Sequence, residues 1–319
     1  MEQMTYAGTG VDYSSMDPFK VLAQKRAAKT SRNAERLGVK SIEPSRGESV
    51  FLADFGTATY VGHVEEGLGT KNLVADAVRS YTGKTHYDQI AQDTVAMIVN
   101  DMVTLGIFPV TCAMHLAVGN SDWFKDEERV RDLVEGWGAA CDMARCIWSG
   151  GETPTLKDII IPGTALLSGS AIGKPIRGIF NPSKIEDGDE IYFLHSSGVH
   201  ANGLTLARRI AEKLPLGYQT PLSDGSTYGE TLLDPTAIYV KFIEECLDNY
   251  VDIHYAVNIT GHGWRKLMRA PQPWSYVIDN LPPQLPIFDF LQEHGPVSDE
   301  EAYSNLNMGA GFALFVSKG

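Results

Sequence analysis

Three stretches of the sequence carry carboxylates in places where they could hold a cation. In EEGLGTK, Glu66 stands before two glycines and a lysine, and in SGGETPTL Glu152 follows a pair of glycines. A third stretch, DQIAQDTVAMIVNDMVTLG, contains Asp93 and Asp101. Glycine turns present backbone N–H groups to phosphate, and carboxylate oxygens suit hard cations such as Mg²⁺. With no zinc pattern, these residues favour magnesium–nucleotide chemistry over metal-dependent hydrolysis or a Ser-His-Asp nucleophile.

Each stretch also has a plainer interpretation. The order Gly-Thr-Lys is not the Walker order Gly-Lys-Thr, so EEGLGTK is not a P-loop. A tight turn with an exposed acid would also explain Glu152. In the third stretch, helical steps of about 100° place Asp93, Asn100 and Thr104 in one polar stripe, with Asp101 at its edge. The stripe is either a solvent face or a cation site, and its lack of Lys, Glu and Arg favours the site.

One histidine lies in a segment that could do chemistry. HSSGVHANG places His200 between a Ser-Ser-Gly turn and an Asn-Gly step. It is either a turn residue whose ring bonds nearby backbone, or a group that binds phosphate or moves a proton. The segment alone leaves both open. Most other histidines fall in predicted strands or turns, whereas His262 in TGHGW stands between two glycines.

The composition limits the classes of partner. The chain has 319 residues, 43% of them hydrophobic, and a formal net charge of -13, which disfavours binding to nucleic acid or to an anionic membrane. Its four cysteines form no Cys-x-x-Cys pair, and no signal peptide or bilayer-spanning apolar run is found. We therefore expect reduced thiols, no zinc and a cytoplasmic protein.

The elements that must position these residues alternate between strands and helices, which predicts a mixed α/β fold. The length favours two domains, and the turn-rich linker KPIRGIFNPSKIEDGD places the boundary between 1–174 and 175–319.

Several element positions follow from local signals. Asp17-Pro18 predicts the start of a long basic helix that reaches Leu37, and Asp234-Pro235 predicts a second helix start. The run SYVID predicts a strand near the end of the chain. Further helices are expected at about 88–105, 126–145 and 203–213.

Eight motifs, taken in order, resemble those of one family. YAGTGVDY, GLGTK, AQDTVAMIVNDMVTLG, GGET, HSSGVHANG, LLDPTAIYVK, NITGHG and NMGAG are similar to successive motifs of the phosphoribosylformylglycinamidine cyclo-ligase, or AIR synthetase, family. The resemblance runs from about Tyr6 to Val316. It implies AIR-synthetase-like N- and C-terminal domains, and a homodimer in which N-terminal domains pair into a β-barrel. It also implies that ATP and Mg²⁺ bind between the domains, near the partner.

The resemblance also implies a reaction and a set of site residues. In this family, ATP activates the formyl amide oxygen of formylglycinamidine ribonucleotide as an iminophosphate, and the amidine nitrogen displaces phosphate to close an imidazole ring for purine biosynthesis. The implied catalytic residues are His200, Asn202 and Lys71. The implied nucleotide-binding residues are Gly67, Gly69, Thr70, Lys71, Asp93, Asn100, Gly150, Gly151 and Gly261, and the implied metal ligands are Glu66, Asp101 and Glu152.

This chain departs from the family pattern at several points. The usual glycine-rich loop before GLGTK is replaced by VKSIEPSRGESVFLAD, which has one glycine. Glu66 stands where aspartate is usual, Met114 replaces an aspartate, and His262 interrupts an all-glycine turn. These changes predict a divergent member with a remodelled pocket.

Two other functions fit the same residues. The first is an ATP-dependent kinase or amide-activating enzyme of the same superfamily that acts on another small substrate. The second is a nucleotide-binding subunit without turnover. Retention of Asp101, Glu152, Lys71 and His200 argues against the second.

Overall fold

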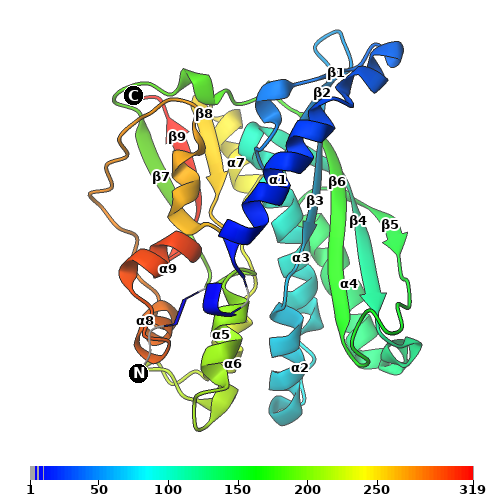
Figure 1. Ribbon diagram of the computed structural model, residues 1–319, viewed down its shortest axis with the longest axis vertical. Coiled ribbons are helices and arrows are strands. Elements are labelled where there is room, and N and C mark those ends of the chain that lie inside the picture. The colour runs from blue at the N-terminus through cyan, green and yellow to red at the C-terminus, as the bar shows by residue number, and fades with distance from the viewer. Residues whose placement is uncertain (1–3, 6, 10, 319) are drawn as a thin grey trace.

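The computed structural model describes residues 4–5, 7–9 and 11–318, so Tyr6, where the resemblance begins, lies outside the described residues. Within this part the chain builds two sheets that lie side by side with helices around them (Figure 1). The larger sheet has the strand order β1-β2-β3-β6-β4-β5, and only β4 and β5 are parallel. Its strands are β1 (Lys40–Ser41), β2 (Phe51–Asp54), β3 (Tyr60–Gly67), β4 (Ile107–Val118), β5 (Ile147–Glu152) and β6 (Ala165–Pro175).

The larger sheet has one covered face and one open face. Helix α3 (Tyr87–Met102) packs against β3, β4 and β6, and α4 (Glu127–Met143) packs against β5. On β6, Leu167 and Ala171 are buried, whereas Leu166 and Ile172 point the other way and are 49% and 48% exposed. This alternation has the period of two expected of a strand. It leaves large apolar side chains on the open face.

The smaller sheet comes from the second half of the chain. It has the order β7-β9-β8, with β9 pairing antiparallel to both neighbours. All six residues of β8 are buried. Its strands are β7 (Glu190–His195), β8 (Ile253–Asn258) and β9 (Ala310–Val316), and its helices are α5 (Leu204–Ala211), α6 (Tyr228–Leu232), α7 (Val240–Asp248), α8 (Pro286–His294) and α9 (Asp299–Asn305). The predicted mixed α/β class is confirmed, while the domain boundary at 174 stays a prediction.

The predicted start of the first helix is wrong by several residues. Helix α1 (Tyr13–Ala28) is capped by Asp12, whose carboxylate accepts the Ser14 N–H at 2.9 Å, so Pro18 lies inside the helix. After Ala28 the chain continues as a 3₁₀ segment, η2 (Ser31–Leu37), and not as one long helix. Gly38 ends that segment at a φ of 72°, as a glycine readily does.

Two other predicted elements are also wrong. The helix expected from Asp234-Pro235 begins only at Val240, because the backbone of the preceding segment is hydrogen-bonded to α3 instead of to itself. The run SYVID forms no strand. A groove of about 910 Å³, lined by β7 and by residues 274–283, separates it from the edge of the smaller sheet.

Helices α3 and α4 lie at their predicted positions. Helix α2 (Lys71–Thr82) packs against α3 and α6. No helix in the described part of the chain is long and apolar enough to cross a membrane. The cytoplasmic location stays a prediction.

Two glycines of α4 give a matched test of packing. A Cβ on Gly136 would lie 2.5 Å from the Cα and carbonyl oxygen of Asp88 on α3, whereas one on Gly138 would meet nothing within 4 Å. Gly136→Ala should lower the free energy of unfolding by roughly 1–3 kcal/mol because helix backbones cannot yield cheaply. Gly138→Ala should raise it by roughly 0.5–1 kcal/mol by reducing unfolded-state entropy. Urea unfolding measures both, and equal effects would contradict this packing.

Candidate functional site

The predicted phosphate turn joins β3 to α2. Glu66 and Gly67 end the strand, Gly69 has a φ of +78° that favours glycine, and Thr70 occupies the cap position before α2. The Thr70 hydroxyl oxygen is buried and has no hydrogen-bond partner within the described residues. A buried hydroxyl without a partner is costly, so this atom marks a place where a ligand oxygen could be bound.

Lys71 and Asp93 form a buried ion pair. The Lys71 Nζ lies 2.8 Å from Asp93 Oδ2 and 2.9 Å from Asp93 Oδ1, and both side chains are 0% exposed. Nζ also donates to the carbonyl oxygen of Asp234 at 2.7 Å. Asp93 Oδ1 accepts the backbone N–H of Thr236 at 2.8 Å and its hydroxyl as well. The pair therefore joins α2 and α3 to the segment 233–239, hereafter the strap.

The polar stripe on α3 faces the strap along much of its length. The Asn100 amide donates to the carbonyl of Ala237 at 2.8 Å and accepts the N–H of Tyr239 at 2.9 Å. Gln92 donates to the carbonyl of Thr236 at 2.9 Å. Asp93, Asn100 and Thr104 are buried, so the stripe is not a solvent face. The motif LLDPTAIYVK is therefore the hydrogen-bonding partner of this stripe. This pairing was not predicted from the sequence.

Asp101 belongs to a second polar group near the phosphate turn. It accepts the Asn258 amide at 2.7 Å, and Lys266 donates to the carbonyl of Asn258 at 3.1 Å and to the hydroxyl of Thr260. Burial, followed by the charge of Asp101, raises the pKa of Glu66 to about 7. Burial lowers the pKa of Lys266, although the two carboxylates oppose this.

Sequence reasoning missed Asn258 and Lys266. Lys266 is buried in the 3₁₀ segment η8 (Gly263–Arg269). A lysine after a glycine turn usually indicates a solvent-exposed position. The signal available was Asn258 directly after the apolar residues Tyr255–Val257, since a buried amide needs a hydrogen-bond partner.

Glu152 is not brought together with the other two predicted metal ligands. By register, Glu66 pairs with Gly169 of β6, and that row continues through Met114 to Gly151 of β5. Glu152 stands in the next row, so alternation places it on the opposite face, about three strand spacings or ~14 Å across the sheet. No group of three His, Cys, Asp or Glu side chains able to hold a metal ion occurs within the described residues.

Gly150 and Gly151 shape the end of β5. Gly150 has a φ of +99°, and a Cβ on Gly151 would lie 1.8 Å from the carbonyl oxygen of Met114. Both glycines are exposed, as is Glu152. The GGET motif therefore permits close pairing of β5 with β4 and presents its acid on the open face of the sheet.

His200 is buried and holds its own turn. It adopts a φ of 59°, is 3% exposed, and its Nε2 accepts the N–H of Ser197 at 3.1 Å. Burial, followed by the charge of Lys71, lowers the pKa of His200 to about 3. The ring is therefore neutral at pH 7, and the contacts present match the turn interpretation.

Asn202 links this turn to the glycine turn 261–263. Its Oδ1 accepts the N–H of Gly261 at 3.0 Å. His262 replaces a family glycine at a φ of 70° and stacks on Tyr13 of α1 with ring centroids 3.8 Å apart. A Cβ on Gly261 would lie 2.5 Å from the Tyr13 hydroxyl. The departure at His262 thus anchors α1 on the second half of the chain.

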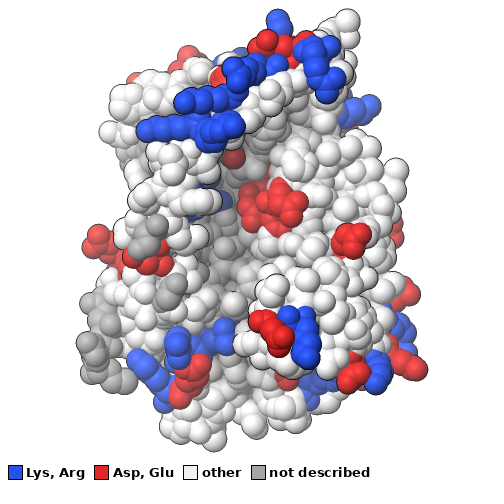
Figure 2. All heavy atoms as spheres, turned by 45° about the vertical axis from the view of Figure 1, so that its right-hand side comes forward, with Lys and Arg blue, Asp and Glu red and all other residues white. Residues whose placement is uncertain are grey.

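Charged side chains gather around a hollow in one face of the molecule (Figure 2). Figure 2 shows a hollow on one face, with Asp and Glu side chains gathered beside it and a row of Lys and Arg side chains above it. Helix α1 and the segment after it supply exposed cations, among them Lys20, Lys25, Arg26 and Lys29. The opposed charges suit a ligand that carries both phosphate and a cation.

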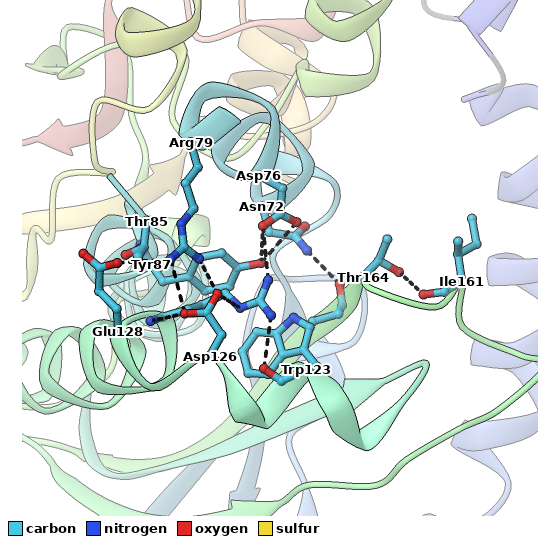
Figure 3. A network of polar contacts seen from close by, with 12 residues as sticks. Asn72, Asp76, Arg79, Thr85, Tyr87, Trp123, Asp126, Glu128, Ile161 and Thr164 are labelled. Carbon is cyan, nitrogen blue, oxygen red and sulfur yellow. Dashed lines mark hydrogen bonds and ion pairs between the residues drawn. The ribbon is translucent and has the colours of Figure 1, made fainter. Parts of the chain in front are cut away.

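A separate network fixes α2 from the side away from the strap (Figure 3). Asn72 donates to the carbonyl of Ala165 at 2.8 Å, and the Tyr87 hydroxyl donates to Asp76 at 3.1 Å. Arg79 forms an ion pair with Asp126 of the cap of α4. The phosphate turn therefore precedes a helix that is held on both sides.

Comparison with known proteins identifies the family. The chain is 35% identical over 321 residues to a phosphoribosylformylglycinamidine cyclo-ligase of Methanocaldococcus jannaschii, covering 99% of this chain and 85% of the relative. It is 31% identical over 319 residues to the enzyme so named from Methanosarcina acetivorans, covering 99% and 89%. The chain belongs to the phosphoribosylformylglycinamidine cyclo-ligase family. The family described as AIR synthase related protein, N-terminal domain, matches residues 65–174 of it.

Solved structures share the cyclo-ligase fold at low sequence identity. A structure of AaThiL complexed with AMPPCP and TMP matches with a TM-score of 0.53 at 13% identity, covering 85% of this chain and 79% of that one. A HypE–HypF complex matches with a TM-score of 0.57 at 14% identity, covering 85% and 78%. These likenesses concern the fold alone.

The depressed pKa of His200 predicts a pH effect on the stability of this cyclo-ligase family member. The unfolded chain binds a proton at His200 below about pH 6.5, but the folded chain does so only near pH 3. Stability is therefore lost as the pH falls through this window, by about 1.4 kcal/mol per pH unit. His200→Asn, which tolerates a positive φ, should lose less stability between pH 6 and 4 in urea unfolding. Parallel pH profiles of the two proteins would contradict the buried neutral ring.

Proposed function

We propose that this chain converts formylglycinamidine ribonucleotide to aminoimidazole ribonucleotide in purine biosynthesis, with ATP as phosphoryl donor and ADP and phosphate as products. The observation that carries the proposal is the similarity to cyclo-ligases over 98–99% of the chain. Partial similarity could reflect a shared domain, but similarity of this extent includes both halves of the chain. ATP and a nucleotide substrate follow from this activity.

The phosphate turn supplies the proposed site for the ATP phosphates. Gly67, Gly69 and Thr70 present backbone groups and an unpartnered hydroxyl directly before α2. The N-terminus of a helix carries partial positive charge, which favours phosphate. Gly150, Gly151 and Gly261 are assigned to nucleotide binding by the sequence pattern alone and stay predictions.

The residues at the turn fit Mg²⁺ in their chemistry. Mg²⁺ in nucleotide sites is held by one or two carboxylates together with phosphate oxygens and waters. Burial, followed by the charge of Asp101, raises the pKa of Glu66, and a bound cation would offset both effects. When bound, Mg²⁺ would neutralise charge on the transferred phosphoryl group. We propose Glu66 and Asp101 as its ligands.

The turn around His200 supplies the proposed substrate side. Nε2 of His200 accepts a backbone N–H, so the ring at neutral pH orders the Ser197–Gly203 turn and does not act as a charged acid. Asn202 ties this turn to Gly261. We propose that the turn's backbone and Asn202 orient the formyl amide toward the phosphate turn. The chain then contributes alignment and charge stabilisation, while the attacking nitrogen belongs to the substrate.

Turnover tests this function directly. Purified protein with ATP, Mg²⁺ and formylglycinamidine ribonucleotide should form aminoimidazole ribonucleotide, detected by mass spectrometry. Asp101→Asn should lower turnover by about 10²-fold or more, because it removes charge that supports the cation at the phosphoryl group. Glu293→Gln, an exposed acid on α8, is the control and should be neutral. ADP formation with a phosphorylated product and no imidazole product would show a kinase of this superfamily. Wild-type turnover by Asp101→Asn would remove Asp101 from the site.

We also propose that two copies pair through the open face of the larger sheet. Val110, Leu166 and Ile172 are 40%, 49% and 48% exposed there, and Ile147 of the edge strand β5 is 64% exposed. Apolar patches of this kind favour association, and an unpaired strand edge favours pairing with another strand. Such pairing would place Glu152 against the partner and would close the barrel that the family resemblance implies.

Light scattering tests this pairing. The wild-type protein at micromolar concentration should have about twice the chain mass of 34.9 kDa. Leu166→Lys with Ile172→Lys should shift it to a single-chain mass, because lysines cannot be buried against the partner without cost. Val277→Lys, which changes an equally apolar and 79% exposed residue elsewhere, is the control and should leave the dimer intact. A stable wild-type monomer would refute the proposal.

A further inference from the structure

The ammonium group of Lys71 is held by two hydrogen bonds and by its ion pair with Asp93. A lysine ammonium carries three N–H donors. Nζ donates to Asp93 Oδ1 at 2.9 Å and to the carbonyl oxygen of Asp234 at 2.7 Å, and it forms an ion pair with Asp93 Oδ2 at 2.8 Å. With 0% of either charged side chain exposed, the ammonium points into the protein and not toward a ligand.

We propose that Lys71 and Asp93 form a clamp that positions the strap 233–239 against the phosphate turn, so that Lys71 is a positioning residue and not a phosphate ligand. The inference rests on the proposed cyclo-ligase function and changes the role of one residue within it. Lys71 is the first residue of α2 and follows Thr70 directly. The contacts that fix the Lys71 side chain therefore also fix the position of the phosphate turn.

The strap connects the Lys71–Asp93 ion pair to the turn around His200. Thr236 is held by Asp93, and the next residue back, Pro235, accepts the hydroxyl of Ser197 through its carbonyl oxygen. Ser197 in turn donates its N–H to His200. The phosphate turn and the His200 turn are thus joined by one short series of contacts through Lys71, Asp93 and the strap.

This arrangement gives a specific kinetic expectation. If the clamp aligns two segments that each bind their own ligand, its loss should lower kcat and leave the affinity for ATP unchanged. A small misplacement of reacting groups can cost about 10²-fold in rate. A phosphate ligand, in contrast, contributes to ATP binding, so its loss should weaken that affinity.

The experiment uses Lys71→Met, Thr236→Val and the double variant. Thr236→Val keeps the size of the side chain and removes its hydroxyl bond to Asp93. Thr94→Val is the matched control, because the Thr94 hydroxyl is buried in α3 but bonds only the carbonyl of Ile90. Calorimetry with Mg²⁺ and ATP should give the wild-type Kd for all variants. The kcat should fall for Lys71→Met and Thr236→Val, and the double variant should be no worse than Lys71→Met.

Hydrogen exchange gives a second measurement that needs no substrate. The backbone N–H groups of Thr236 and Tyr239 are bonded to Asp93 and Asn100. Lys71→Met and Thr236→Val should speed exchange in the strap 233–239, whereas Thr94→Val should not.

The outcomes separate this inference from the proposed function. Weakened ATP binding in Lys71→Met with unchanged exchange in the strap would overturn the clamp, as would Thr236→Val behaving like Thr94→Val in both kcat and exchange. If Lys71→Met does not fold, Thr236→Val decides alone by the same two measurements. Failure of the wild-type protein to form aminoimidazole ribonucleotide would refute the cyclo-ligase proposal, and the exchange comparison would still decide the clamp.

Discussion

The arrangement of the two halves depends on the buried ion pair between Lys71 and Asp93. Taking two charges out of water is costly, and their attraction offsets this cost only when the geometry is good and the remaining hydrogen bonds are satisfied. Here Asp93 also accepts two bonds from Thr236, and Lys71 donates to the backbone of Asp234. Loss of one partner would leave the other charge buried and unpaired, which typically costs about 3–5 kcal/mol. The strap therefore has one favourable position on α3.

The same constraint explains why the strap is not helical. A helix beginning at Pro235 would use the N–H groups of Tyr239 and its neighbours for internal bonds. In the structure, Asn100 takes the Tyr239 N–H and Gln92 and Asn100 occupy the carbonyls of Thr236 and Ala237. Side chains of α3 thus replace the backbone partners that a helix would supply, and the helix begins only at Val240. The Asp-Pro signal is local, whereas these competing partners lie more than 130 residues away in the chain.

The sequence predicted the features that depend on neighbouring residues. It did not predict those that depend on contacts between residues far apart in the chain. The positions of helices α3 and α4 follow from the periodicity of their residues, which is a local property, and they are confirmed. The burial of the polar stripe was not predictable in this way, because a stripe of short polar side chains has the same pattern whether it faces water, a metal or another segment. Its lack of Lys, Glu and Arg excluded a usual solvent face. That absence did not distinguish a cation site from a hydrogen-bonded seam.

The positions of the three candidate carboxylates could likewise not be predicted from local sequence. Sequence order places Glu66, Asp101 and Glu152 in three motifs of one family, but whether they converge depends on strand register. Glu152 follows Gly151 by one residue, and one residue along a strand reverses the face on which a side chain lies. The row through Glu66 reaches Gly151, so a site on the covered face receives a glycine backbone from β5 and not the neighbouring acid. The metal ligands proposed on that face are therefore Glu66 and Asp101, next to the turn that precedes Lys71.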